Sequence, residues 1–388
     1  MAETLGGLGG LALKLGQLAS YVDGLVPLEH QETYEQHLRS LRSRAPAMTA
    51  DAAARVIRRE LGREPEEAFQ GFESVPFASA SIGQVHRAAV AGVPVAVKVQ
   101  HESIGRSVAS DLDNASLLGA LLGEWGAKLG VRGMLVEMRE RFAQEMDYRA
   151  EADAQRFFGQ MFAGDPSVAI PRVFDGHSAE RVLTTGLAEG IGFEDACAAS
   201  EPERRAWAET IWRFVFSCVL LAGRFNADPH PGNFLFQPNG RVWFLDFGCT
   251  RAHSLEKLRL VRDCHRAALG GDGRELNRSV AEMFELAAGS GLAMRASGFI
   301  RLCCQPILGG APHRITRAYV RHLMQRMRGH IRATLGAPGA GNGIPREFLF
   351  FNRLQFGLYS VLARLDVDAD YASVHARVLA ALDGQEGS

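Results

Sequence analysis

Residues 228–248 read DPHPGNFLFQPNGRVWFLDFG, and this stretch decides the fold class. Two short apolar runs, Phe234–Gln237 and Arg241–Leu245, flank a Pro-Asn-Gly turn at 238–240. A turn of this composition between two apolar runs predicts a β-hairpin, because Asn and Gly readily adopt the positive φ of a tight turn. The polar residues on either side of this hairpin are the first candidates for chemistry.

The residues before the hairpin have the spacing of a phosphotransferase catalytic loop. Asp228 and Asn233 form a D-x4-N pattern, in which the Asp can orient or accept a hydroxyl proton and the Asn can reach a metal ion. His230 stands between two prolines and is expected to be a structural hydrogen-bonding residue rather than a general base. After the hairpin comes Asp246-Phe247-Gly248, and the Asp246 carboxylate is a candidate ligand for Mg²⁺.

An earlier segment supplies a candidate cation. Residues Val93–Gln100 read VPVAVKVQ, and this alternation predicts a strand whose valines share one face. Ala96 and Lys98 then share the other face. The run matches the kinase pattern V-A-I-K, in which the lysine holds the α- and β-phosphates of a nucleotide. A small Ala96 would leave room for a purine, and the order of these motifs is that of a kinase-like fold.

The remaining secondary structure is expected to be mostly helical. Thr49 as a cap and Gly62 as a stop predict a helix over Ala50–Leu61. The other expected elements are a helix over about 133–162, strands near 169–174 and 181–187, and mainly helices after Gly190.

The composition is that of a folded protein and excludes several functions. Among 388 residues, 47% are hydrophobic, and 43 Lys+Arg balance 44 Asp+Glu. No global basic field exists, so a nucleic-acid partner is not expected. The six cysteines form no C-x-x-C pair, which argues against a zinc or redox motif and favours buried, reduced thiols. The most apolar stretch, 211–222, is too short to span a bilayer, and no secretory signal is visible. We therefore expect a cytoplasmic, at most membrane-peripheral, protein.

Three further motifs make the chain resemble one kinase family. Lys14-Leu15-Gly16-Gln17 has the form K-x-G-Q, and Glu145-Met146-Asp147 has the form E-x-D. Residues 78–86, ASASIGQVH, resemble an alanine-rich loop that replaces the glycine-rich loop of ordinary kinases. Together with 228–233, these motifs are similar to those of the UbiB/ADCK atypical kinases, also called aarF-domain kinases. The resemblance runs from Lys14 to about Asp366.

The resemblance implies an α+β, two-lobed protein-kinase-like fold with an N-terminal helical extension. The expected boundaries are 1–66 for the extension with the K-x-G-Q motif, 67–190 for the N-lobe, and 191–388 for the mainly helical C-lobe.

The resemblance also implies roles for individual residues. Lys98 would pair with Glu151 and position the phosphates of ATP, and Asp228 would be the catalytic carboxylate. Asn233 and Asp246 would hold Mg²⁺. The alanine-rich loop would cover the nucleotide through Ala78, Ser79, Ala80 and Ser81. Access to the cleft would be restricted by Lys14, Gln17, Glu145 and Asp147, although without the resemblance these charged positions read as solvated helix residues.

The chain also departs from the family pattern. Asn226 stands where the family often has His, and Thr184-Thr185-Gly186 stands where relatives usually carry a bulkier residue and an acid. After Gly248 the chain leads almost directly to Ser254, a plausible helix cap, with no A-P-E sequence. Ordinary protein kinases use that segment to dock a peptide, so a protein substrate is not expected.

The expected function is that of an ATP- and Mg²⁺-dependent atypical kinase or ATPase in isoprenoid-quinone or other lipid metabolism. Its partner would be a lipid or a quinone-precursor-like small molecule. Two alternatives remain. One is a small-molecule phosphotransferase of the aminoglycoside- or choline-kinase type, against which the K-x-G-Q extension speaks. The other is an ATP-gated module that binds a lipid without phosphoryl transfer.

A basic helix is expected near the C-terminus. Residues 313–333 read as one helix, and five arginines fall on one side of it at helical spacing: Arg314, Arg317, Arg321, Arg328 and Arg332. This side is either a solvated face of an ordinary amphipathic helix or a docking face for an anionic membrane.

Overall fold

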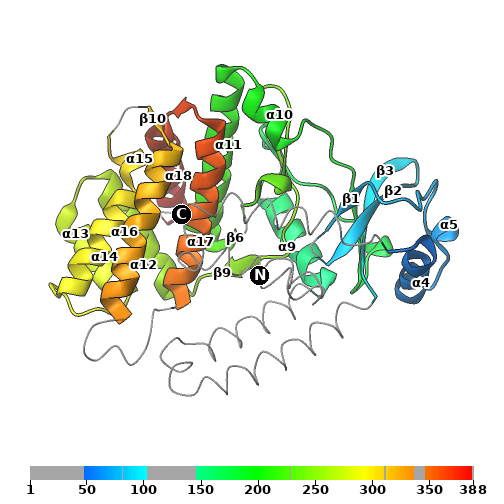
Figure 1. Ribbon diagram of the computed structural model, residues 1–388, viewed down its shortest axis with the longest axis horizontal. Coiled ribbons are helices and arrows are strands. Elements are labelled where there is room, and N and C mark those ends of the chain that lie inside the picture. The colour runs from blue at the N-terminus through cyan, green and yellow to red at the C-terminus, as the bar shows by residue number, and fades with distance from the viewer. Residues whose placement is uncertain are drawn as a thin grey trace, which may run out of the picture. The chain divides into compact units, whose positions relative to one another are not determined.

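A computed structural model describes residues 48–80, 82–102, 146–227, 229–309, 312–335 and 346–386 (Figure 1). The chain divides into two compact units: unit 1 is Met1–Phe157 with Pro171–Ala188, and unit 2 is Phe158–Ile170 with Glu189–Ser388. Both units combine strands and helices, so the expected α+β class is confirmed. The finer boundaries 1–66, 67–190 and 191–388 stay a prediction.

Unit 1 is built on a four-stranded antiparallel sheet. Its strands run in the order β1 (Ala78–Ser79), β2 (Gly83–Val90), β3 (Val93–Gln100) and β5 (Val182–Gly186). Val95, Val97 and Val99 of β3 are fully buried on one face, as the alternation predicts. The outermost valine, Val93, is half exposed because it lies at the end of the strand.

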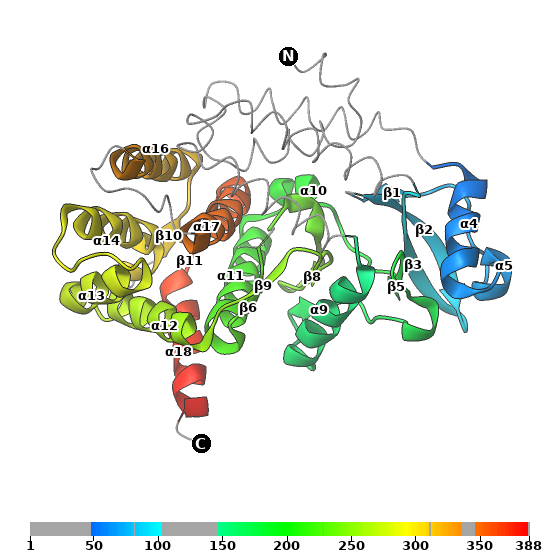
Figure 2. The same cartoon turned by 90° about the horizontal axis from the view of Figure 1, so that it is seen from below.

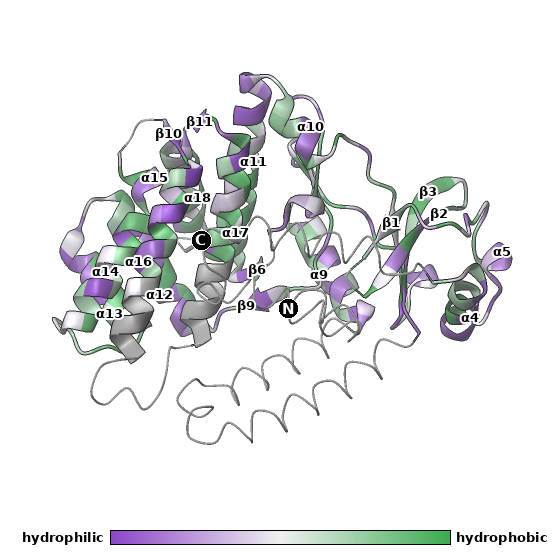
Figure 3. Ribbon diagram, in the orientation of Figure 1, coloured by the Kyte–Doolittle hydropathy of each residue, from purple (hydrophilic) through white to green (hydrophobic). Residues whose placement is uncertain are grey.

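A short helical layer covers the valine face of this sheet. Helix α4 (Ala50–Leu61) contributes Ala53, Val56 and Ile57 to the same apolar cluster, and α5 (Pro65–Ala68) follows it (Figure 2). Thr49 accepts a hydrogen bond from the Ala52 amide, and Gly62 ends the helix with φ of 69°. Both predicted caps are therefore confirmed. In Figure 3, α4 carries hydrophobic and hydrophilic colour on different sides, as expected for a helix that packs on a sheet.

The boundary between the units falls inside one helix. Helix α9 (Tyr148–Met161) is the described part of the helix expected over 133–162. The strand expected over 169–174 is wrong in its extent, because β4 covers only Val168–Ala169. Pro171 lacks an amide hydrogen and stops the strand, and beyond it only an isolated bridge joins Val173 to Thr185.

The part of unit 2 that follows Glu189 begins with two helices, and the second of them is long and has a buried face. Helix α10 (Phe193–Ala198) precedes α11 (Glu201–Ser217), whose Trp207, Ile211 and Trp212 are almost completely buried. A π-helical turn, Cys218–Ala222, then leads to β6 (Arg224–Asn226).

The predicted hairpin is present in unit 2. Its strands are β7 (Phe234–Phe236) and β8 (Val242–Phe244), and β8 also pairs in parallel with β4. Asn239 and Gly240 have φ of 61° and 75°, which is the turn geometry that their residue types predict.

The C-terminal part of unit 2 is helical. Its helices are α12 (Leu255–Leu269), α13 (Gly273–Met283), α14 (Gly291–Cys303), α15 (Gln305–Leu308), α16 (Arg317–Leu335), α17 (Arg346–Leu365) and α18 (Tyr371–Glu386). Within this part, α13 packs between α12 and α14, and α16 packs between α14 and α17 (Figure 1). Within the described residues, no helix is both long and apolar enough to cross a membrane. All six cysteines are free thiols, as expected.

The expected helix over 313–333 is wrong at its start. His313–Arg314 form β10, which pairs with β11 (Asp368–Ala369), and α16 begins only at Arg317. Thr316 sets this start, because its hydroxyl accepts a hydrogen bond from the Tyr319 amide. The Arg314 guanidinium lies 2.8 Å from the Asp368 carboxylate, so it does not belong to the basic face of the helix.

Candidate active site

An ion pair in unit 1 is the best-defined element of the candidate site. The Lys98 ammonium donates to both carboxylate oxygens of Glu151, at 2.9 and 2.8 Å. The two side chains are only 15% and 7% exposed. Lys98 lies on β3 and Glu151 on the first turn of α9, so the fold brings together two residues that are 53 positions apart. The family resemblance predicted this pair.

Tyr148 completes the surroundings of the lysine, and sequence analysis missed it. Its ring centroid lies 4.9 Å from the Lys98 ammonium, which adds a cation–π contact. Tyr148 precedes Glu151 by three positions, so both face the same side of α9. This i, i+3 spacing is the signal that could have identified it.

The alanine-rich loop is only partly a loop. Ala78 and Ser79 form β1, and the Ala80 amide donates to the Gly83 carbonyl at 2.9 Å. A Cβ added to Gly83 would lie 2.3 Å from the Val99 carbonyl oxygen, so only glycine allows β2 to approach β3 here. Ala78, Ser79 and Ala80 are therefore held close to the strand that carries Lys98, whereas Ser81 lies outside the described residues.

The strand that pairs with β3 explains one departure from the family pattern. Thr184 is fully buried, and its hydroxyl donates to the His177 carbonyl, so its side chain points into the unit. Thr185 is the register partner of Ala96 and therefore shares a sheet face with Ala96 and Lys98. On this face the direct register partners of Lys98 are Val85 and Leu183, and the smaller Ala96 and Thr185 pair two positions further along β3.

In unit 2, the residues around the D-x4-N pattern are fixed mainly by backbone hydrogen bonds. The His230 Nδ1 accepts from the Gly232 amide at 3.0 Å and caps a 3₁₀ turn, Pro231–Asn233. This contact confirms that His230 has the structural role expected of it. The Asn233 amide donates to the His230 carbonyl at 2.9 Å, which places Asn233 at the end of the turn. Asp228 lies outside the described residues.

Asp246 lies at the same end of the hairpin as Asn233. The Leu245 amide donates to the Asn233 carbonyl at 3.0 Å, and the Asp246 Oδ1 accepts from the Gly248 amide at 2.9 Å. No cluster of three or more His, Cys, Asp or Glu that could hold a metal occurs among the described residues. A carboxylate and an amide oxygen still fit Mg²⁺, which prefers oxygen ligands and takes few of them from protein.

Asn226 explains the second departure from the family pattern. Its side-chain amide donates to the Asp246 carbonyl and so connects β6 to the Asp246-Phe247-Gly248 turn. Phe247 is 1% exposed and stacks on Phe158 with ring centroids 5.2 Å apart. The turn that carries Asp246 is thus anchored by both a hydrogen bond and a buried ring.

Gly357 also shapes the surroundings of the D-x4-N pattern, and sequence analysis missed it. A Cβ added to this residue of α17 would lie 2.6 Å from the Cγ of Pro229. Glycine is therefore required where α17 packs against the residue that follows Asp228. An isolated glycine inside a helical pattern was the available signal.

The segment after Gly248 is short and ordered, as the sequence predicted. Residues Thr250–Ala252 form β9, which pairs with β6 in the register Asn226↔Thr250. The Ser254 hydroxyl then accepts from the Lys257 amide and caps α12. The chain between Asp246 and α12 is therefore occupied by a short paired strand and a helix cap.

The candidate gating residues are largely untested by the structure. Lys14, Gln17 and Glu145 lie outside the described residues. Asp147 lies just before α9 and accepts a hydrogen bond from the Arg149 amide at 2.9 Å. Its role stays a prediction.

Comparisons with known proteins identify the family of the chain. The family model described as ABC1 atypical kinase-like domain matches residues 40–280. The rat mitochondrial atypical kinase COQ8B is 32% identical over 277 residues, which are 70% of this chain and 51% of the rat protein. The yeast (Saccharomyces cerevisiae) mitochondrial atypical kinase COQ8 is 31% identical over 246 residues, which are 62% and 48% of the two chains. An uncharacterised protein of Synechocystis is 34% identical over 253 residues, or 63% and 43%.

The chain spans about half the length of the curated relatives it matches. Among solved structures, the complex of Rv3197 with erythromycin from Mycobacterium tuberculosis aligns with a TM-score of 0.69 and 24% identity. The alignment covers 94% of this chain and 90% of that chain, and it supports the expected two-lobed kinase-like fold. On the strength of the family model and its relatives, the chain belongs to the UbiB/ADCK family of atypical kinases.

Proposed function

We propose that this chain is an ATP- and Mg²⁺-dependent kinase or ATPase of the UbiB type. The observation that carries the proposal is the Lys98–Glu151 pair, in which a shielded ammonium is held by both oxygens of one carboxylate. In kinase-like folds a strand lysine in such a pair holds the α- and β-phosphates of the nucleotide. Ala96 and Thr185, on the same sheet face, would leave space for the adenine.

The remaining roles follow the chemistry of phosphoryl transfer. Asp246 and Asn233 would hold Mg²⁺, which when bound neutralises charge on the phosphate oxygens. Asp228 would orient the acceptor hydroxyl or accept its proton. Lys98 would fix the phosphates, and the backbone around Ala78, Ser79, Ala80 and Ser81 would cover them.

The acceptor is proposed to be a lipid or a quinone-precursor-like small molecule. The pairing of β9 with β6 and the immediate start of α12 support this choice, because they leave no segment for peptide docking. Family resemblance supplies the link to isoprenoid-quinone and lipid metabolism. Lys14, Gln17, Glu145 and Asp147 are proposed to restrict access of other acceptors.

Nucleotide turnover tests the proposal. The purified chain should hydrolyse MgATP, and turnover should rise when anionic liposomes and a quinone-precursor-like phenol are added together. Phosphorylated phenol would identify a kinase, and phosphate release alone would identify an ATPase. Binding of MgATP without either product would contradict catalysis and favour an ATP-gated lipid-binding module. Absence of MgATP binding by calorimetry would remove the proposal altogether.

Peripheral membrane contact is part of the same proposal. Arg317 and Arg321 are exposed on α16, while Val320, Leu323 and Met327 of the same helix are buried. Each basic residue near an anionic surface contributes about 1 kcal/mol, and salt screens this attraction. Flotation with anionic liposomes should show salt-sensitive binding that is lost when Arg317, Arg321 and Arg328 are replaced by Glu. Equal binding of the two proteins would exclude this helix from membrane contact.

A further inference from the structure

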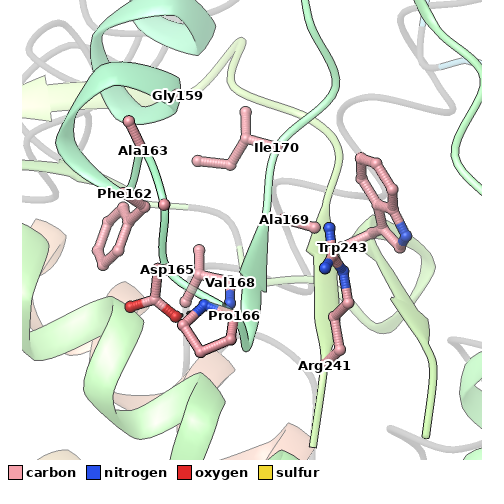
Figure 4. Close-up of a pocket in the computed structure, with 11 residues that line it drawn as sticks. Gly159, Phe162, Ala163, Asp165, Pro166, Val168, Ala169, Ile170, Arg241 and Trp243 are labelled. Carbon is pink, nitrogen blue, oxygen red and sulfur yellow. Dashed lines mark hydrogen bonds between the residues drawn. The ribbon is translucent and has the colours of Figure 1, made fainter.

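Unit 2 contains a cavity that none of the roles above uses. It has a volume of about 410 Å³ and lies where the end of α9, the following loop, β4 and the start of β8 meet (Figure 4). Sites for small molecules are typically roughly 300–1,000 Å³. The cavity is therefore large enough for a one- or two-ring molecule.

The lining combines apolar surface with one cation. Phe162, Ile170 and the Trp243 ring provide the apolar part. The Arg241 guanidinium lies 5.7 Å from the Trp243 ring centroid, and Figure 4 shows it beside that ring and Ala169. Most of the exposed lining is nevertheless polar, so a matching ligand would combine a ring with a negative charge.

Arg241 lacks a counter-ion within the part of the chain that the structure describes. No ion pair to it is present there, and its Nε–H has no hydrogen-bond acceptor. The nearby Trp243 indole N–H likewise has no acceptor among those residues. A half-buried guanidinium without an anion can pair with a carboxylate, which accepts two parallel hydrogen bonds from it.

Asp165, the acidic residue of the lining, does not neutralise the charge of Arg241. The Asp165 carboxylate receives hydrogen bonds at 2.6 and 2.9 Å from Arg213, which is not part of the lining. Burial would raise the pKa of Asp165, but the bonds from Arg213 and from the Ser167 amide outweigh it and lower the pKa to about 2. Asp165 is thus already paired, and the cavity keeps the positive charge of Arg241.

We propose that this cavity binds a small aromatic carboxylate. The ring would contact Phe162, Ile170 and the Trp243 face, and the carboxylate would pair with the Arg241 guanidinium. The site is lined by residues of unit 2 alone, and neither Lys98 nor Glu151 is among them.

The test is a ¹⁹F NMR titration of the full chain with 4-(trifluoromethyl)benzoate. Saturable binding is expected at or below millimolar probe. Arg241→Gln should weaken binding about tenfold or more, since the charge-assisted pair is lost. The neutral 4-(trifluoromethyl)benzamide should bind the wild type about tenfold more weakly for the same reason. Arg326→Gln, which removes an exposed arginine of α16, is the matched control and should bind like the wild type.

A blocking variant tests the cavity itself. A Cβ added to Gly159 of α9 meets only the Ile170 Cγ2, at 3.9 Å, so Gly159→Leu can be accommodated while filling the space. This variant should melt at or above the wild-type temperature, because leucine favours a helix over glycine, and it should no longer bind the probe. Any one of five results would overturn the proposal. For the variants, these are wild-type affinity in Arg241→Gln, an equal loss of affinity in Arg326→Gln, and unchanged binding by folded Gly159→Leu. For the probes, they are equal binding of the benzamide and no saturation at millimolar benzoate.

Discussion

The two units fix their candidate catalytic side chains by different means. In unit 1, Lys98 is held by another side chain, Glu151, and both are largely shielded from water. In unit 2, the contacts of Asp246 and Asn233 include hydrogen bonds to main-chain groups of the turns around them. A substitution of Lys98 should therefore change both stability and activity, whereas one of Asp246 should change activity alone.

Asp246→Asn is expected to have the largest effect on activity and almost none on stability. Loss of the charged metal ligand should lower MgATP binding and turnover by about 100-fold or more. The Asn amide oxygen can still accept from the Gly248 amide, so the turn should persist. Calorimetry with MgATP and a thermal melt measure the two quantities. Wild-type affinity in the variant would remove Asp246 from the site.

Lys98→Met should lower both turnover and stability. Turnover should fall by about 100-fold, because the phosphates lose their cation. Stability should fall by about 3 kcal/mol or more, because the carboxylate of Glu151, which is 7% exposed, loses its ion-pair partner.

The double variant Lys98→Met/Glu151→Gln separates the two effects. It should recover most of the urea stability, since no buried charge is left without its partner, but no turnover. If the single variant were as stable as the wild type, the contrast between the two units would fail.

Unit 2 also contains a buried pair of side chains, His265 and His375. Unlike the Lys98–Glu151 pair, it carries no charge at neutral pH. His265 Nδ1 and His375 Nε2 lie 3.1 Å apart in unit 2, surrounded by the rings of Trp212 and Phe216. Burial lowers the pKa of His265 from 6.5 to about 4. Burial and the neighbouring His265 lower the pKa of His375 well below its usual value.

The sign of the resulting pH dependence follows from these directions. Below pH 6.5 the unfolded chain binds protons that the folded chain does not, so stability present above that pH is lost as the pH falls toward 4. The loss should be on the order of 3 kcal/mol in urea unfolding. His265→Gln keeps a hydrogen-bonding side chain without titrating, and its stability should depend less steeply on pH. An unchanged slope would assign the acid sensitivity to other groups.

The smallest effect is expected at Asn226. Two substitutions there distinguish the hydrogen bond to the Asp246 carbonyl from the identity of the residue, which is often His in the family. Asn226→His keeps an N–H that can reach the Asp246 carbonyl, and turnover should stay within about threefold of the wild type. Asn226→Leu loses the donor and should cost about 1 kcal/mol of stability. Equal results for the two variants would show that this hydrogen bond does not position the turn.

The sequence predicted those parts of the molecule in which local pattern and tertiary structure agree. The alternation around Lys98 and the Pro-Asn-Gly turn determine their own geometry, so β3 and the β7–β8 hairpin were correctly expected. The pairing of Lys98 with Glu151 came from family resemblance, because no local pattern specifies a contact between such distant residues.

The roles of Arg314, Gly357 and Tyr148 depend on tertiary contacts, which a local sequence pattern does not specify. Arg314 continues the helical spacing of Arg317 and Arg321, yet pairing of β10 with β11 removes it from the helix. The need for glycine at 357 arises from Pro229, which is far away in sequence. Tyr148 becomes part of the site only once α9 has packed beside β3.

The buried position of Phe247 has a consequence for inhibitor chemistry. The packing of the phenylalanine in an Asp-Phe-Gly turn differs between active and inactive kinases, so a compound could be designed to bind only when this ring has left its packed position. Here that ring is 1% exposed and stacked on Phe158, and the Thr250 hydroxyl donates to its carbonyl at 2.8 Å. Vacating a buried phenylalanine site costs about 3–5 kcal/mol, which would weaken such a compound by roughly 100-fold to a few thousandfold. Selective ligands for this protein should therefore be sought among molecules that leave Phe247 in place.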